Sequence, residues 1–241
     1  MKKTVTFLFF FCLLSCCQTV LAENKTITFS THIKKDSILF KKTYAIMDET
    51  FRRLGYSFKM ESYPALRALQ RANDGYTDGE AHRIFGIEQK YTNLVRIPEI
   101  QMRIYNYAYS LKPIKIENGW SGLGEYNVAV RRGSIFVSEM AQKHAKSVYE
   151  LNNHESLFKF LIAGRADIAI NSPIQVKDML KDPQFQNIKL TKHEPPLTAL
   201  PIFAYLNKKH DSLVPLIAEK LRDMKIDGTY NEIMKKFRVQ Y

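Results

Sequence analysis

The stretch GYTDGEAHRIFG, residues 75–86, places an acid, a histidine and an arginine within four positions. Glu80 and His82 could transfer protons to or from a bound molecule, and the Arg83 guanidinium offers a planar fork of donors that suits a carboxylate. The alternative is a surface pair between Arg83 and Glu80, which contributes little to stability. The pattern favours ligand contacts from Arg83 and Glu80, with His82 turned outward in a loop.

The first 22 residues have the pattern of a bacterial secretory signal. Two lysines precede an apolar run from Val5 to Leu14, and Ala22 offers a small residue for cleavage. The run is shorter than the roughly 20 apolar residues that a membrane span needs. All three cysteines, at positions 12, 16 and 17, lie in this segment, so a chain cleaved after Ala22 carries no thiol. The alternative is a lipoprotein in which Cys16 becomes the lipidated N-terminus.

The composition excludes several classes of protein. The chain of 241 residues has a formal net charge of +12, but its basic residues are interleaved with acids along the whole sequence. This distribution favours a solvated basic surface over a nucleic-acid partner. The sequence contains no HExxH, P-loop or dinucleotide-binding motif, and its histidines lack a metal-binding spacing. We therefore expect neither a cofactor nor a metal.

Strand and helix patterns alternate after residue 25, which predicts an α/β fold with parallel strands. Strands are expected at 26–31, 56–63, 77–80, 102–112, 126–132, 167–170 and 200–209. Helices are expected at 40–55, 65–75, 135–145 and 155–164, with a terminal helical pair at 213–237 that breaks at Asp227-Gly228. The phrase helix, glycine, aspartate, strand occurs twice, in LQRANDGYTDGEA and FLIAGRADIAI. This repetition suggests two similar lobes.

The order of five segments carries a family resemblance over nearly the whole chain after residue 22. The segments are ITFST, ETFRRLGYSFKMESYPALRALQRANDGYTDG, YNVAVRRGS, LFKFLIAGRADIAINS and LIAEKLRDMKIDGTYNEIMKKF. Together they resemble the family 3 extracellular solute-binding proteins, the periplasmic receptors of amino-acid ABC transporters and related sensors. The resemblance implies a two-lobed type II periplasmic binding fold, with RIYNYAYSLK and LPIFAYLNKK as hinge crossovers. Lobe 1 would comprise residues 23–108 and 199–241, and lobe 2 residues 109–198.

In such a fold, ligands bind beyond the carboxyl ends of the strands. The candidate ligand-binding residues lie near these ends: Arg83, Glu80, Ser134, Asn171, Tyr63, His32 and Arg67. Ser134 could bind an anion at the start of a helix or only cap that helix. Tyr63, His32 and Arg67 could equally be packing or surface residues. Trp120 is expected in the core of lobe 2 or at the hinge.

Two departures from the family pattern weaken the case for a standard α-amino acid as ligand. In the receptors that this chain resembles, an acid near position 171 holds the ammonium group of the ligand. Asn171 and Ser172 stand there in this sequence, and Asp167 is expected to cap a turn instead. The Thr-x-x-Arg motif that binds a carboxylate is also missing from GIEQKY, residues 86–91.

We therefore expect a monomeric periplasmic binding protein without catalytic activity. It would capture a small polar solute with a carboxylate by hinge closure and deliver it to an ABC permease. One alternative is a ligand sensor or scaffold that signals to a membrane receptor. Another is an enzyme on the same fold, such as a periplasmic dehydratase of prephenate-like substrates, with Glu80 and His82 in acid–base roles.

Overall fold

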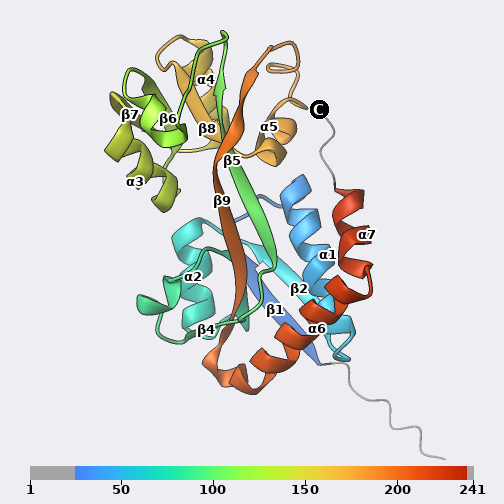
Figure 1. Cartoon of the computed structure of the whole chain (residues 1–241). Coiled ribbons are helices and arrows are strands. Elements are labelled where there is room, and N and C mark those ends of the chain that lie inside the picture. The colour runs from blue at the N-terminus through green and yellow to red at the C-terminus, as the bar shows by residue number, and fades with distance from the viewer. Residues whose placement is uncertain (1–24, 238–241) are drawn as a thin grey trace, which may run out of the picture.

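The computed structural model describes residues 25–237 of a two-lobed α/β protein (Figure 1). The predicted secretory segment, its cleavage position and all three cysteines therefore lie outside the described residues. No helix in residues 25–237 is both long enough and apolar enough to cross a membrane.

Lobe 1, at the bottom of Figure 1, is built around β1 (Thr26–Thr31). This strand pairs in parallel with β2 (Ser57–Ser62) and with β3 (Gly79–Arg83). Three helices pack on one face of the sheet: α1 (Ile38–Arg52), α6 (Val214–Ile226) and α7 (Thr229–Lys236). The helix α2 (Ala65–Asn73) and the short strand β4 (Leu94–Arg96) contribute to a smaller apolar cluster on the other face.

The amphipathic pattern of α1 explains how the larger core of lobe 1 forms. Ile46, Met47 and Phe51 are fully buried, because their spacing places them on one side of the helix. The Phe51 ring stacks on that of Phe58 from β2, with 5.1 Å between the ring centroids. Gly228, at φ 88°, ends α6 and lets the chain turn into α7, as the sequence predicts.

Lobe 2, at the top of Figure 1, repeats the parallel arrangement. Here β6 (Asn127–Arg131) pairs with β7 (Ser147–Leu151) and with β8 (Ile168–Asn171). The helix α3 (Ile135–His144) packs on one face, whereas α4 (His154–Ile162) and α5 (Pro173–Met179) pack on the other. Trp120 packs against the α3 side of this core, in agreement with the expected role in the core of lobe 2.

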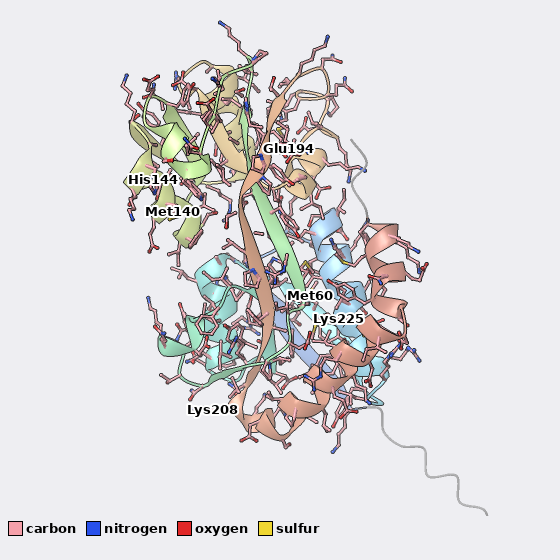
Figure 2. All side chains as sticks on the ribbon, in the orientation of Figure 1. Met60, Met140, His144, Glu194, Lys208 and Lys225 are labelled. Carbon is pink, nitrogen blue, oxygen red and sulfur yellow. The ribbon has the colours of Figure 1, made fainter. Side chains whose placement is uncertain are left out.

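Two long antiparallel strands join the lobes: β5 (Met102–Ser110) and β9 (Thr191–Asn207). Figure 2 shows β9 running from Glu194 in lobe 2 to the end of lobe 1 that carries Lys208. The strand order is β2-β1-β3-β9-β5-β8-β6-β7, so the two crossovers stand between the parallel halves. The proposed lobe boundaries, at 108/109 and 198/199, fall inside these two strands.

Two predicted strands are placed differently by the structure. The strand expected at 77–80 lies at Gly79–Arg83, because the turn before it extends to Asp78, whose N–H and carboxylate both bond to Thr28. The second crossover begins at Thr191 rather than at Leu200, because its first residues pair with the end of β5.

Candidate functional site

Glu80 is the buried acid of lobe 1. The strand β3 lies between β1 and β9, and this position leaves the Glu80 side chain fully buried. Ser30 Oγ donates to Glu80 Oε2 at 3.0 Å, and Arg83 Nε donates to Glu80 Oε1 at 2.9 Å. Burial raises the pKa of Glu80 to about 7, against the opposing effects of Arg83 and Ser30. Both carboxyl oxygens are therefore engaged within lobe 1.

Arg83 is held inside lobe 1 rather than at its surface. Its side chain is only 12% exposed. Besides the Nε bond to Glu80, Arg83 Nη2 donates to Ala65 O at 2.9 Å. The interpretation of a surface pair with Glu80 is therefore wrong. Arg83 Nη1 forms no hydrogen bond within residues 25–237, which leaves donors for a ligand.

His82 is buried, with 5% exposure, and its predicted outward orientation is wrong. The reason is that β3 continues through Arg83, so residue 82 belongs to the sheet and not to a loop. Its ring centroid lies 5.9 Å from that of His32, which follows β1. His32 Nδ1 lies 3.9 Å from Glu80 Oε1. Burial, assisted by the charge of Arg83, lowers the pKa of both histidines well below 6.5, so both are neutral at pH 7.

Asn171 and His154 lie on the side of lobe 2 that faces these residues of lobe 1. The two facing sides are called the lobe 1 wall and the lobe 2 wall. Asn171 is the buried last residue of β8, and its Oδ1 accepts a bond from Ser172 N at 2.9 Å. Its Nδ2 then donates to His154 Nδ1 at 3.0 Å, which leaves the imidazole proton on Nε2. Burial, followed by the charges of Arg131 and His32, lowers the pKa of His154 to about 3. His32 belongs to lobe 1, so the lowered pKa of His154 has a contribution from across the lobes.

Arg131 is the last residue of β6, and it carries the positive charge of the lobe 2 wall. Burial lowers the pKa of Arg131, and the charge of Arg83 lowers it further. Its Nη1 donates to Arg132 O at 3.3 Å, and no acid within residues 25–237 forms an ion pair with it. Two guanidinium groups from opposite lobes therefore influence each other without a carboxylate shared between them.

These side chains from both lobes are called the interlobe cluster here. Its members are His32, Glu80, His82, Arg83, Arg131, His154 and Asn171. The lobes also touch directly beside it, where Ile38 N at the start of α1 donates to Asp178 Oδ2 of α5 at 3.0 Å. Among residues 25–237, no three histidine, cysteine or acidic side chains are placed to hold a metal. Guanidinium groups and neutral imidazoles suit a small anion.

Three candidates from the sequence form no hydrogen bond or ion pair with the cluster. Ser134 occupies the N-cap position of α3, but its side chain accepts no capping bond. Tyr63 donates to Glu61 Oε2 at 2.6 Å, and the Arg71 guanidinium lies 4.6 Å from its ring centroid. Arg67 is exposed on α2.

The sequence reasoning overlooked Ser30, Arg131 and His154. Arg131 stands at the end of the first strand of lobe 2, much as His32 follows the first strand of lobe 1, so the same strand-end rule could have identified it. His154 opens α4, and no pattern in the sequence links it to Asn171. Ser30 lies within β1, opposite Glu80.

Comparison with known proteins supports the fold. No family model matches the chain. An uncharacterized protein of Shewanella oneidensis is 29% identical over 216 residues, which cover 86% of this chain and 80% of that relative.

The similar solved structures include an extracellular binding protein and a sensor domain. A probable amino-acid ABC transporter extracellular-binding protein from Bacillus subtilis superposes with a TM-score of 0.73 at 18% identity, covering 88% of this chain and 97% of that one. A histidine kinase sensor domain with similarity to periplasmic binding proteins gives a TM-score of 0.71 at 14% identity, covering 89% and 96%. The predicted fold class, a two-lobed periplasmic binding protein, is thus confirmed.

Proposed function

We propose that the protein is an exported periplasmic solute-binding protein of the family 3 type. It captures a small polar solute with a carboxylate between its lobes, without catalysing a reaction, and passes the solute to an ABC permease. The observation that carries this proposal is the pair of arginines on facing walls, Arg83 and Arg131. No acid within residues 25–237 binds both of them. The fold supports it, because ligands of two-lobed proteins bind at the junction of the lobes.

The charges of the interlobe cluster explain how a ligand would close the lobes. In a closed protein without ligand, Arg83 and Arg131 repel each other; burial lowers the pKa of Arg131 most, and the charge of Arg83 lowers it further. An anion placed between them replaces this repulsion with two attractive contacts, one to each lobe. Because both contacts exist only when the lobes are close, ligand binding shifts the equilibrium toward the closed state.

A second candidate function is ligand sensing. The structural similarity to a histidine kinase sensor domain favours it. The capture step would be the same, but closure would be read by a membrane receptor instead of a permease.

A thermal-shift screen of carboxylates, amino acids, amines and sugars tests the proposal. A solute at 100 times its dissociation constant adds about 2.7 kcal/mol to the free energy of unfolding, which raises the melting temperature. We expect a carboxylate to produce the shift, with a matching decrease of the radius of gyration in solution scattering. Absence of both effects for every compound would overturn the binding function. Conversion of the solute, followed by NMR, would instead establish an enzyme.

The contribution of Arg83 needs a variant that stays folded. Arg83→Gln alone leaves the buried Glu80 carboxylate without its ion pair, so the double variant Glu80→Gln/Arg83→Gln is the better choice. We expect the double variant to lose the carboxylate-induced shift. Arg132→Gln is the control, because Arg132 is exposed and bonds to Asn152 Oδ1. A full shift in the double variant would remove Arg83 from the site.

A further inference from the structure

We infer that the interlobe cluster takes a small dicarboxylic acid that has no amino group. The inference rests on the proposed function and narrows its ligand class. It follows from which charged groups of the cluster are already satisfied by the protein and which remain for a ligand.

Glu80 cannot hold an ammonium group in this arrangement. Its side chain is fully buried, and its two oxygens accept bonds from Ser30 and Arg83. Each oxygen keeps a further lone pair, but the carboxylate has no exposed surface, so an ammonium group could reach it only if the surrounding side chains moved. An amino acid would thus bury its positive charge beside two arginines without an acid to pair with, which is costly.

Lobe 2 offers no replacement acid. Asp178 is close enough to raise the pKa of His154. However, Asp178 Oδ2 accepts the bond from Ile38 N, and Asp178 Oδ1 accepts a bond from Lys181 Nζ at 2.7 Å. The strand β8 ends in Asn171, whose amide is occupied by Ser172 N and His154.

The cations of the cluster, in contrast, exceed its acids. Arg83 is paired with Glu80, but Arg131 has no ion pair within residues 25–237. Lys42 of α1 adds a further positive charge close enough to act on His82, and it too forms no ion pair within this range. With Glu80 ionised, and with Asp178 paired to Lys181, the cluster and Lys42 together hold three cations and one acid. A dianion neutralises this excess.

The placement of the two arginines favours two separate acidic groups. One carboxylate would accept bonds from Arg131 on lobe 2, and the other would accept bonds from Arg83 Nη1 on lobe 1. His32, with 22% of its side chain exposed, and the Nε2–H of His154 can donate to the same oxygens as neutral imidazoles. A single carboxylate would have to divide one negative charge between the two arginines, whereas a dicarboxylate brings one charge to each wall.

Matched ligand pairs test the inference by isothermal titration calorimetry. The dicarboxylates from malonate to adipate are compared with their 2-amino counterparts, such as succinate with aspartate and glutarate with glutamate, and with butyrate as a monocarboxylate. We expect one dicarboxylate to bind at least tenfold more tightly than its amino counterpart and than butyrate.

The other outcomes overturn the inference in distinguishable ways. If the amino counterpart binds as tightly as the dicarboxylate, the inference that the site excludes an ammonium group is wrong, but the proposed capture of a carboxylate stands. If butyrate binds as tightly, the requirement for two acidic groups is wrong. If none of these acids binds while an amine or a sugar does, the carboxylate part of the proposed function fails as well.

Two variants test whether the preference for a dicarboxylate arises from the interlobe cluster. Arg131→Gln should weaken dicarboxylate binding at least tenfold, whereas Arg132→Gln, its neighbour in the sequence, should change binding less than twofold. Asn171→Asp introduces an acid on the lobe 2 wall beside Arg131, and it should shift the ratio of succinate to aspartate affinity at least tenfold toward aspartate. Circular dichroism confirms that each variant is folded. Unchanged affinities in Arg131→Gln, or an unchanged ratio in folded Asn171→Asp, would overturn the inference.

Discussion

The central strands of the two lobes carry the same pair of hydrogen bonds to an aspartate just before the neighbouring strand. In lobe 1, Thr28 N donates to Asp78 Oδ2 at 2.9 Å, and Asp78 N donates to Thr28 O at 2.7 Å. In lobe 2, Asn127 N donates to Asp167 Oδ2 at 2.8 Å, and Asp167 N donates to Asn127 O at 2.9 Å. The repeated sequence phrase of glycine and aspartate therefore produces the same backbone connection twice.

The lobes differ two residues beyond these hydrogen-bonded positions. In lobe 1 the paired residues are Ser30 and Glu80, whereas in lobe 2 they are Ala129 and Ala169. Lobe 1 thus contains a buried acid that holds its own arginine, whereas lobe 2 has two buried alanines at the equivalent positions. The comparison shows that the same backbone connection leads to an arginine paired with an acid in lobe 1 and, among residues 25–237, to an arginine without an ion pair in lobe 2.

The largest expected effect tests how closely β3 is packed. At Gly79 an added Cβ would lie 2.6 Å from Phe29 Cε1 and would also collide with Tyr205 O. At the equivalent position, lobe 2 carries Ile168. Gly79→Ala should therefore lower the free energy of unfolding by about 3 kcal/mol or more, measured by urea denaturation.

Ile168→Val serves as the matched variant in lobe 2. It should cost about 1 kcal/mol, because it removes one buried methylene group. A loss below about 1 kcal/mol for Gly79→Ala would show that β3 can move away from β9 to make room for the methyl group. The packing at Gly79 would then be no tighter than that at Ile168 in lobe 2.

A smaller effect concerns the pH dependence of stability. His82 stays neutral in the folded protein, but it binds a proton below pH 6.5 in the unfolded chain, so stability falls as the pH falls below that value. The loss from His82 therefore grows steadily as the pH falls from 6.5 toward 5. Glu80 acts with the opposite sign, because its folded pKa of about 7 exceeds its unfolded value, so its contribution is lost as the pH rises through 7.

Urea denaturation at pH 7.5, 6 and 5 separates the two groups. We expect His82→Asn to lose less unfolding free energy than the unchanged protein on acidification to pH 5, because it removes the group that binds a proton only in the unfolded chain. We expect Glu80→Gln to lose more than the unchanged protein, because it removes the opposing contribution. A pH profile that neither variant alters would contradict the assigned burial of both side chains.

The smallest expected effect compares two helix starts. Ser37 Oγ accepts a bond from Phe40 N and caps α1 of lobe 1, whereas the Ser134 side chain at the start of α3 in lobe 2 accepts none. Ser37→Ala should cost about 1 kcal/mol of unfolding free energy, and Ser134→Ala less than about 0.5 kcal/mol. Equal losses would mean that Ser134 does cap its helix, which is the simpler of the two roles that the sequence allows.

The fold was largely predictable because its strongest local patterns agree with the tertiary structure. The apolar spacing in α1 and the break at Gly228 identify these helices correctly. The sequence reasoning overlooked β7 and α5. The strand β7 is short and half exposed, so it lacks a clear alternation, but Pro173 at the start of α5 was a usable helix signal.

The site was predictable only where a residue follows a predicted strand. This rule led to His32 and Asn171, and to Glu80 and Arg83, all of which the structure brings into the interlobe cluster. It failed for His82, because the expected strand ended at Glu80, three residues before the observed end at Arg83, which left this side chain in a predicted loop. Contacts between the lobes, such as the effect of Arg131 on His32, depend on closure and cannot be read from spacing along the chain.

The ladder between β5 and β9 is interrupted between the lobes. Asn106 pairs with Thr198, but Ala108, two residues further along β5, pairs with His193, five residues back along β9. The two crossover strands therefore lack regular pairing at this position, and we expect the lobes to twist relative to each other there. We therefore expect substitutions within 194–197 to change the dissociation rate of the proposed solute without changing the side chains that bind it.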